Sequence, residues 1–338
     1  MRVVVDIQHP VDVNFFRGAI RRLREDGHEV LLVVLRRGRV PAIVRHDYPD
    51  LEAIEVGVHS ATRWGLYLRT GLWREVELVR ALRGRGISGA LGFPGFQTAI
   101  VGRLLGFASV GAYDDPEHRP NFVLSRFWLD RFVLPDYLGF AGGNIVPFRG
   151  LKEWGYLCPA QFTPRPEALE PYGLKPREYI FVREVEPRSL NYLDQKEEIV
   201  RALYDAGLSQ HRVVLSLEDK RRQRLFQKWQ ILDEPVADVH SLMYYSRALL
   251  SSGDSMAREA ATLGVPSVYC GRREMRANDA LYEQGLMRQL TDVEPILQQL
   301  VSASGSEAQQ REIRDRLDQL WEDPTDVVVR ALHDVVRG

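Results

Sequence analysis

A short polar turn separates an apolar run from a segment with helical periodicity. It consists of Ser252, Gly253, Asp254 and Ser255. The serine hydroxyls can donate hydrogen bonds, Gly253 permits close backbone approach and unusual φ and ψ angles, and the amino end of a helix attracts anions. The turn could therefore hold a phosphate. Glu259, about one helical turn further along, could accept the paired hydroxyls of a ribose or sugar.

The same turn has a purely structural interpretation. Ser255 or Asp254 could cap the helix, and Glu259 could complement the helix dipole. The spacing matches neither the lysine-containing phosphate loop nor the glycine-rich dinucleotide fingerprint. From spacing alone, both interpretations stay open.

Arg183 could serve the same ligand. It lies at the end of the apolar segment YIFVRE (179–184), from which its guanidinium could face a diphosphate. A salt bridge to Glu184 or Glu186 is the alternative.

Candidate general bases lie in the first loop of the chain, QHPVD (8–12). Asp12 could remove a proton from a hydroxyl, although a carboxylate with its usual pKa of about 4 is a weak base unless burial raises that pKa. Alternatively, Asp12 is the N-cap of a helix that begins at Val13. His9, before Pro10, could be a base or a packed turn residue.

A second candidate loop, YDDPEH (113–118), concentrates Asp114, Asp115, Glu117 and His118. These groups could bind hydroxyls or act in acid and base catalysis, because histidine titrates near neutrality. A solvated turn initiated by Asp115 before Pro116 is the alternative. Adjacent carboxylates point to opposite sides of an extended chain and D-x-D spacing is missing, so we predict no metal here.

Composition narrows the function class. The 338 residues carry a formal net charge of -1, which does not favour nucleic acid as a partner. The basic clusters at 36–39 and 220–224 are typical of solvated faces. Cys158 and Cys270 lack CxxC spacing, so we expect neither a disulfide framework nor a structural zinc site, and we expect a reducing cytoplasm.

Apolar strands alternate with helical segments along the chain, which predicts an α/β protein with doubly wound parallel sheets. A stretch rich in Gly and Pro, 139–178, indicates a boundary. We therefore predict two Rossmann-like domains, 1–165 and 166–338, with the last helix able to pack back on the first. Ligands bind such sheets at the carboxyl ends of the strands, where all the candidate loops fall.

No apolar run is long enough to span a bilayer, so we expect membrane contact to be at most peripheral, at the inner face. A surface that could touch a membrane or a lipid-linked acceptor contains Phe15, Trp64, Leu66, Tyr67 and Trp73. Packing of apolar helices within the first domain explains these residues at least as well.

The segment 242–270, which includes the polar turn, resembles the donor-binding segment of GT-B glycosyltransferases and of nucleotide-sugar 2-epimerases. The resemblance implies a GT-B fold, phosphate contacts from the turn and a ribose contact from Glu259. It also implies that His240 lies near the nucleotide base. The N-terminal segment, YDDPEH and the stretch from KPREYIFVRE onward resemble domain-of-unknown-function family 354, and this similarity covers nearly the whole chain.

The first loop departs from that family. Its members commonly have histidines where this chain has Asp12 and Asn14, while His9 is kept. The second of those histidines lies about where the peptidoglycan GlcNAc transferases carry a candidate base. The identity of the base in this chain therefore stays open among His9, Asp12 and His118.

Together these features predict a metal-independent glycosyltransferase that takes a nucleotide-activated sugar as donor, with a UDP-sugar favoured and no further cofactor. The acceptor would be a glycan or lipid-linked molecule in cell-surface polysaccharide or glycolipid assembly. Two alternatives remain: a nucleotide-sugar 2-epimerase, and a non-catalytic protein that binds a nucleotide-sugar or glycan.

Overall fold

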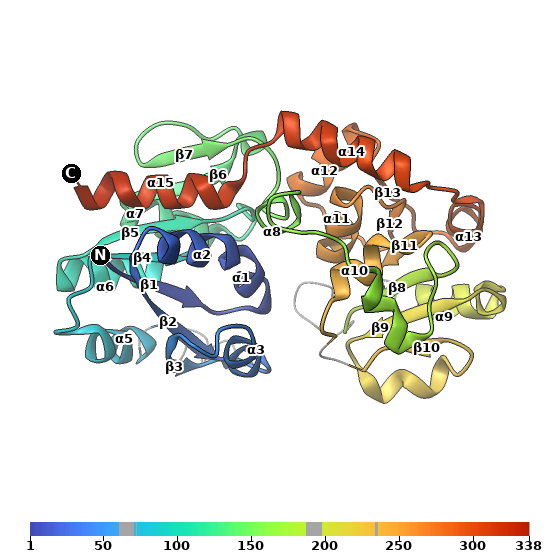
Figure 1. The fold of residues 1–338 in the computed structure, drawn as a ribbon, viewed down its shortest axis with the longest axis horizontal. Coiled ribbons are helices and arrows are strands. Elements are labelled where there is room, and N and C mark those ends of the chain that lie inside the picture. Colours follow the sequence, from blue (N-terminus) through green and yellow to red (C-terminus); the bar gives the residue numbers. More distant parts are fainter. Residues whose placement is uncertain (61–70, 72, 187–197, 234–235, 338) are drawn as a thin grey trace. The chain divides into compact units, whose positions relative to one another are not determined.

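The computed structural model describes residues 1–60, 71, 73–186, 198–233 and 236–337 (Figure 1). The chain forms two compact units, which we describe separately. The first combines Met1–Tyr156 with Leu320–Gly338, and the second is Leu157–Gln319. The division along the chain therefore falls after Tyr156, whereas the sequence placed it after residue 165, and the last segment belongs to the first unit.

The first unit is built on a parallel sheet with the strand order β3-β2-β1-β4-β5-β6-β7. Its strands are β1 (Arg2–Ile7), β2 (Glu29–Arg36), β3 (Glu52–Val58), β4 (Gly89–Gly92), β5 (Ala108–Ala112), β6 (Arg131–Pro135) and β7 (Ile145–Phe148). The order reverses between β1 and β4, so the predicted doubly wound sheet is confirmed in this unit.

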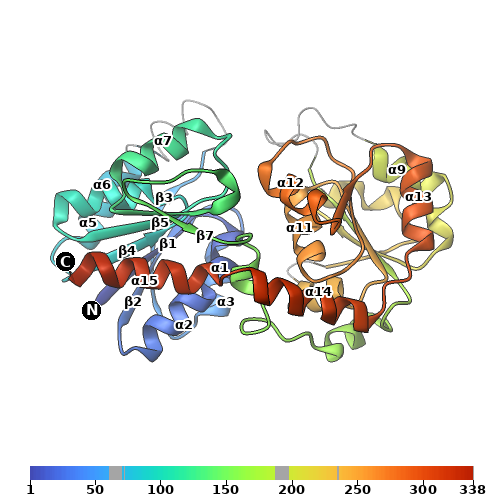
Figure 2. The same cartoon turned by 90° about the horizontal axis from the view of Figure 1, so that it is seen from above.

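Helices cover both faces of this sheet (Figure 2). One face carries α1 (Pro10–Phe15), α2 (Arg17–Glu25), α3 (Val40–Asp47) and α15 (Pro324–Arg337). The other carries α5 (Arg74–Leu82), α6 (Phe96–Leu105) and α7 (Arg119–Trp128). The short segments η2 (Asp136–Leu138) and α8 (Trp154–Leu157) complete the unit. Burial on both faces explains why β1 and β2 are almost continuously apolar.

The last helix, α15, is an integral part of the first unit's core. Val328 and Leu332 are buried in one apolar cluster with side chains from α2 and β5, both of which α15 contacts. At Gly89 in β4, an added Cβ would lie 2.7 Å from Cδ1 of Leu332, which is too close. A glycine at this position therefore lets α15 approach the middle of the sheet.

One charged residue interrupts the apolar strand β1. The carboxylate of Asp6 is completely buried and pairs with the equally buried guanidinium of Arg74 from α5, at 2.5 Å between Oδ1 and Nη2. Arg74 also donates to Oε1 of Gln97 at 2.7 Å, and Gln8 donates to Asp6 at 2.9 Å. These bonds compensate both buried charges and join β1 to α5 and α6.

The second unit has a parallel sheet with the order β10-β9-β8-β11-β12-β13, which reverses between β8 and β11. Its strands are β8 (Ile180–Glu184), β9 (Val213–Leu217), β10 (Gln230–Ile231), β11 (Ala248–Ser251), β12 (Ser267–Tyr269) and β13 (Met287–Gln289). The second predicted doubly wound sheet is thus confirmed as well.

Helices cover this sheet on both faces too (Figure 2). Buried residues of α9 (Ile199–Asp205) and α13 (Val293–Ser302) pack on one face, and α10 (Val239–Tyr244), α11 (Asp254–Thr262) and α12 (Arg276–Glu283) lie on the other. The remaining elements are η3 (Pro166–Tyr172), η4 (Leu208–Gln210), η5 (Lys220–Leu225) and α14 (Glu307–Leu320).

Candidate functional site

The strongest candidate site lies where the strand order of the second unit reverses. β8 and β11 are neighbours there, with Arg183 paired in register with Ser251. The chain then leaves β11 through the polar turn and enters α11, whose first residue is Asp254. Crevices at such reversals are where open parallel sheets bind ligands.

The amino end of α11 differs in detail from the sequence-based expectations. Gly253 is the N-cap, with φ -106° and ψ 140°, an extended conformation that any residue adopts, so it does not use the unusual angles that glycine permits. The N-cap makes no side-chain hydrogen bond, so neither Asp254 nor Ser255 is the N-cap residue, although Oδ1 of Asp254 accepts from the N–H of Ser255 in the first turn at 3.1 Å. The N–H of Gly253 donates to Oγ of Ser251, also at 3.1 Å. An anion at this end would therefore be held by the helix dipole and by first-turn amides other than those of Gly253 and Ser255.

Asp254 has a structural role in holding α11. Its buried carboxylate lies 3.0 Å from Nη1 of Arg258 and 3.4 Å from Nη1 of Arg273, and Arg258 also donates to Asn278 at 3.1 Å. Two guanidiniums therefore face the one carboxylate at the amino end of α11. Their positive charge favours a phosphate there despite the acidic residue in the turn.

Ser252 joins the two strands at the reversal. It is buried, and its Oγ accepts a hydrogen bond from the backbone N–H of Val185 at 3.0 Å. The backbone N–H of Ser252 in turn donates to the carbonyl of Arg183 at 3.0 Å. Ser252 thereby fixes the loop after β8 against the turn after β11. Ser255, in the first turn of α11, is half-buried.

Glu259 and His240, predicted separately, lie together in the structure. Nε2 of His240 in α10 is 3.6 Å from Oε1 of Glu259 in α11, and the two side chains are only 13% and 8% exposed. The ring of Phe162 meets the His240 ring edge-on, with centroids 6.0 Å apart. This group offers a hydrogen-bonding carboxylate beside two aromatic rings, which is the chemistry that a nucleoside needs. No motif in the sequence indicated that Phe162 would belong to this group.

Arg183 points toward β9. Its Nη1 donates to Oγ of Ser216 at 2.9 Å, and its Nη2 lies 3.3 Å from Oε2 of Glu218. Of the two alternative partners expected from the sequence, Glu184 pairs with Arg222 instead. To contact a diphosphate at α11, the Arg183 guanidinium would have to turn away from Glu218.

Glu184 has a separate partner. Nη1 of Arg222 donates to the buried Glu184 carboxylate at 2.7 Å. Arg222 belongs to the basic cluster 220–224, which the sequence predicted to be a solvated face. Burial raises the pKa of Glu184 to about 7, and the charge of Arg222 opposes this change. The basic cluster is thus partly structural.

In the first unit, His9 and Asp12 form a reciprocal cap at the start of α1. His9 is the N-cap and its Nδ1 accepts from the N–H of Val11 at 3.3 Å. Oδ2 of Asp12 accepts from the N–H groups of Gln8 and His9, at 2.8 Å each. The helix begins at Pro10, so the expected N-cap role of Asp12 before Val13 was wrong, and Asp12 is the third helical residue.

The environments of Asp12 and His9 shift the pKa values of these two side chains in opposite directions. Burial raises the pKa of Asp12 to about 7, against the lowering effect of its two backbone hydrogen bonds. Burial, followed by the charges of Arg37 and Lys152, lowers the pKa of His9 to about 4, although His9 as a residue is exposed. Asp12 is therefore a base of suitable strength at neutral pH, although its side chain is only 2% exposed. His9 is neutral, accepts a hydrogen bond at Nδ1 and can donate one at Nε2.

The acidic loop 113–118 lies between β5 and α7. Asp114 is buried and pairs with Nζ of Lys152 at 2.7 Å. Asp115 is half-buried, and Glu117 and His118 are exposed just before α7. Because Lys152 also acts on the pKa of His9, the loops after β1 and β5 face the same ammonium group. Lys152 was not among the predicted residues, because it follows β7 and shares no local pattern with either loop.

The described residues also limit the expected membrane surface. Phe15 is 1% exposed and cannot contribute to it, while Trp73 is 55% exposed. Trp64, Leu66 and Tyr67 lie outside the described residues. Within the described part of the chain, no helix combines the length and the apolar character needed to cross a bilayer.

A cavity of about 430 Å³ occurs elsewhere in the second unit. It is lined by residues that include Gly264, Pro266, Arg288, Glu312 and Arg316. It lies near the amino end of β12, away from the carboxyl ends of the strands. The carboxyl ends carry the amino end of α11 and the Glu259–His240 pair, and we therefore place the candidate site there.

Comparison with known proteins links this geometry to one fold. Residues 153–337 match the profile of a family described as protein of unknown function, DUF354. None of the curated proteins matches the chain.

Three solved structures illustrate the fold similarity. UDP-GlcNAc 2-epimerase from Methanocaldococcus jannaschii has a TM-score of 0.67 and 14% identity, and the alignment covers all of both chains. Spinosyn forosaminyltransferase SpnP has a TM-score of 0.68 and 17% identity, again over all of both chains. MurG from Acinetobacter baumannii has a TM-score of 0.60 and 16% identity, over 99% of this chain and 100% of the other. The chain therefore has the GT-B fold of glycosyltransferases and nucleotide-sugar 2-epimerases, as predicted.

Proposed function

Since the chain belongs to the DUF354 family of proteins of unknown function, we propose its function from its fold and site: it is a GT-B glycosyltransferase that uses a nucleotide-activated sugar. The observation that carries this proposal is the Glu259–His240 pair, which joins α10 to α11, the helix that begins at the strand reversal of the second unit. The donor would be a UDP-sugar, and the reaction would need neither a metal nor another cofactor.

Each part of the site has a proposed role. The amides at the start of α11, together with Ser252, Ser255 and the positive charge around Asp254, would stabilise the diphosphate as the glycosidic bond breaks. Glu259 would accept hydrogen bonds from ribose hydroxyls, with His240 next to the base. Arg183 would join the diphosphate only after leaving Glu218.

The first unit would supply the acceptor side. Asp12 is the proposed general base because its pKa is raised to about 7, close to the pH at which it would act. His9 would donate a hydrogen bond through Nε2, and Asp115, Glu117 and His118 would bind acceptor hydroxyls or, in the case of His118, replace Asp12 as base. The acceptor would be a glycan or lipid-linked molecule of a cell-surface polysaccharide or glycolipid.

Nucleotide binding tests the donor site directly. Calorimetric titration with UDP, GDP, CMP and dTDP, alone and as sugar conjugates, should give selective binding to one nucleotide class. Glu259→Ala should weaken this binding by about one to two decades, because a hydrogen bond to a charged group contributes roughly 1.5–3 kcal/mol.

The matched control is Glu294→Ala, an exposed glutamate of α13 in the same unit, which should bind as the unaltered protein does. An unchanged dissociation constant for Glu259→Ala would refute the assignment of Glu259. No binding by the unaltered protein at millimolar nucleotide would refute the proposed donor site as a whole.

A nucleotide-sugar 2-epimerase is the second candidate. It is favoured by the buried acid–base groups of the first unit, since Asp12 and the Asp114–Lys152 pair could exchange protons with a sugar. Incubating the preferred nucleotide-sugar without acceptor and following it by NMR separates the candidates. A new epimer, or free sugar, supports the epimerase, whereas turnover that depends strictly on an acceptor supports the transferase. Tight binding without either reaction would indicate a binding protein.

A further inference from the structure

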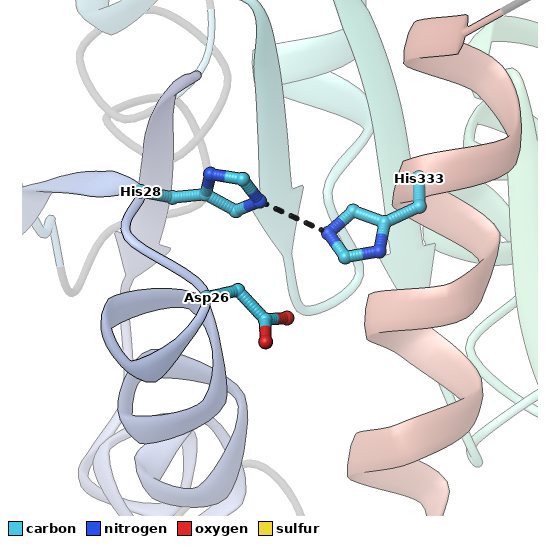
Figure 3. Close-up of side chains that lie close together, drawn as sticks. All are labelled: Asp26, His28 and His333. Atoms are coloured by element: carbon cyan, nitrogen blue, oxygen red, sulfur yellow. Dashed lines mark hydrogen bonds between the residues drawn. The ribbon is translucent and has the colours of Figure 1, made fainter.

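Two histidines from opposite ends of the chain face each other in the first unit. His28 lies just before β2, and His333 lies in α15 (Figure 3). Their Nε2 atoms are 3.3 Å apart, and their rings are nearly perpendicular, at 88°. Asp26, the C-cap residue of α2, places its carboxyl group close to both rings. One donor atom from each of the three residues lies within 4.8 Å of the others.

This spacing fits a metal ion. Two nitrogen ligands at about 2.0–2.1 Å from a tetrahedral zinc ion are separated by about 3.3–3.4 Å, the length of the tetrahedral edge. The observed separation of the two Nε2 atoms, 3.3 Å, has this value. Asp26 is exposed, so its side chain can adjust its torsion angles to bring one oxygen to the third position.

The contact between the two rings supports ligation. An N–H···N hydrogen bond needs one Nε2 atom that carries no proton, so at least one ring presents a free nitrogen lone pair. Neutral imidazole is the form that binds metals. The hydrogen bond between the rings also needs a proton on the other Nε2. When a cation binds both Nε2 atoms, that ring takes the tautomer with its proton on Nδ1, and both rings stay neutral. The N-terminal nitrogen, 3.4 Å from Nδ1 of His28, would accept from an Nδ1–H in its neutral amine form.

We propose that Asp26, His28 and His333 bind one divalent transition-metal cation, with Zn²⁺ the best fit, and that the cation fastens α15 to the turn between α2 and β2. Water would fill the remaining position. The site lies at the amino end of β2, whereas His9 and the acidic loop follow the carboxyl ends of β1 and β5. The metal would therefore stabilise the first unit and take no part in sugar transfer.

Zinc binding by the full-length, tag-free protein tests the proposal. Isothermal titration with Zn²⁺ should show one site with a micromolar or lower dissociation constant, and saturating Zn²⁺ should raise the Tm of the first unit. His28→Gln and His333→Gln should each weaken Zn²⁺ binding at least tenfold and abolish the rise in Tm. His46→Gln, in an exposed residue of α3, should leave both results unchanged.

Cobalt gives a readout that does not depend on stability. Co²⁺ added to the unaltered protein should produce the intense visible absorption of a tetrahedral site, and this absorption should be lost in His333→Gln. No Zn²⁺ binding at millimolar metal, equal binding by both histidine variants and the unaltered protein, or only the weak absorption of octahedral Co²⁺ would each overturn the proposal. The His28–His333 contact would then be only a hydrogen bond.

Discussion

At the scale of single residues, the first loop combines structure and potential chemistry in one carboxylate. Asp12 accepts two backbone hydrogen bonds that start α1, yet its burial raises its pKa to about 7. The sequence identified Asp12 as a candidate but misjudged its position in the helix. The signal was present, because Pro10 is favoured at the first helical position and His9 precedes it.

The raised pKa of Asp12 predicts a pH dependence of stability. In the unfolded chain this carboxyl loses its proton near pH 4, whereas in the folded chain it keeps the proton until about pH 7. Its contribution to stability is therefore fully present below pH 4 and is lost as the pH rises to 7, by at most about 1.4 kcal/mol for each pH unit.

Asp12→Asn removes this titration. Urea unfolding at pH 4 to 8 should show the unaltered protein losing stability relative to the variant as the pH rises, with a constant difference above pH 7. A difference that stays the same at every pH would contradict the raised pKa. Loss of transfer activity in a variant that remains folded would in addition support Asp12 as the base.

At the scale of elements, the two sheets were readable from the sequence because both of their faces are buried. Contacts between loops could not be predicted from the sequence. Lys152 reaches Asp114 and influences His9, and Glu259 meets His240, only because parallel strands bring distant segments to one edge. Local periodicity carries no information about such meetings.

The buried pair between β1 and α5 gives a prediction about stability. Arg74→Met leaves the Asp6 carboxylate buried without its charged partner and should lower the free energy of unfolding by about 3–5 kcal/mol. Urea unfolding measures the change. Asp6→Leu combined with Arg74→Met should recover most of the loss, because no uncompensated charge remains.

The exposed pair of Arg45 and Glu55, 3.7 Å apart, provides the control. Arg45→Met should cost less than about 1 kcal/mol, as is typical of surface ion pairs. Equal losses for Arg74→Met and Arg45→Met would show that the buried pair is not specially important.

At the scale of the whole molecule, the second unit is continuous in sequence and the first is not. We therefore predict that residues 157–319 fold alone and keep the nucleotide affinity of the full chain, as circular dichroism and calorimetry would show. A fragment that remains unfolded, or that folds without binding the nucleotide bound by the full chain, would contradict this prediction.

Removing residues 320–338 should have the opposite effect on the first unit. Each large aliphatic side chain that α15 buries contributes roughly 1.5–3 kcal/mol, and Val327, Val328, Val329 and Leu332 are all buried. Their sum is comparable with the whole stability of an ordinary domain, about 5–15 kcal/mol. Thermal unfolding of 1–319 should lack the transition of the first unit, and a full-length profile would contradict the role given to α15.

Because α15 belongs to the first unit, the two units should also complete their folding in a particular order during synthesis in the cell. A ribosome finishes Met1–Tyr156 early, but the apolar face that α15 covers stays open until more than a hundred and fifty further residues have been made. The second unit can fold during this interval, as domains generally do while the chain grows. The half of the protein that is made first is thus completed last, and newly made chains would depend most on chaperones in that interval.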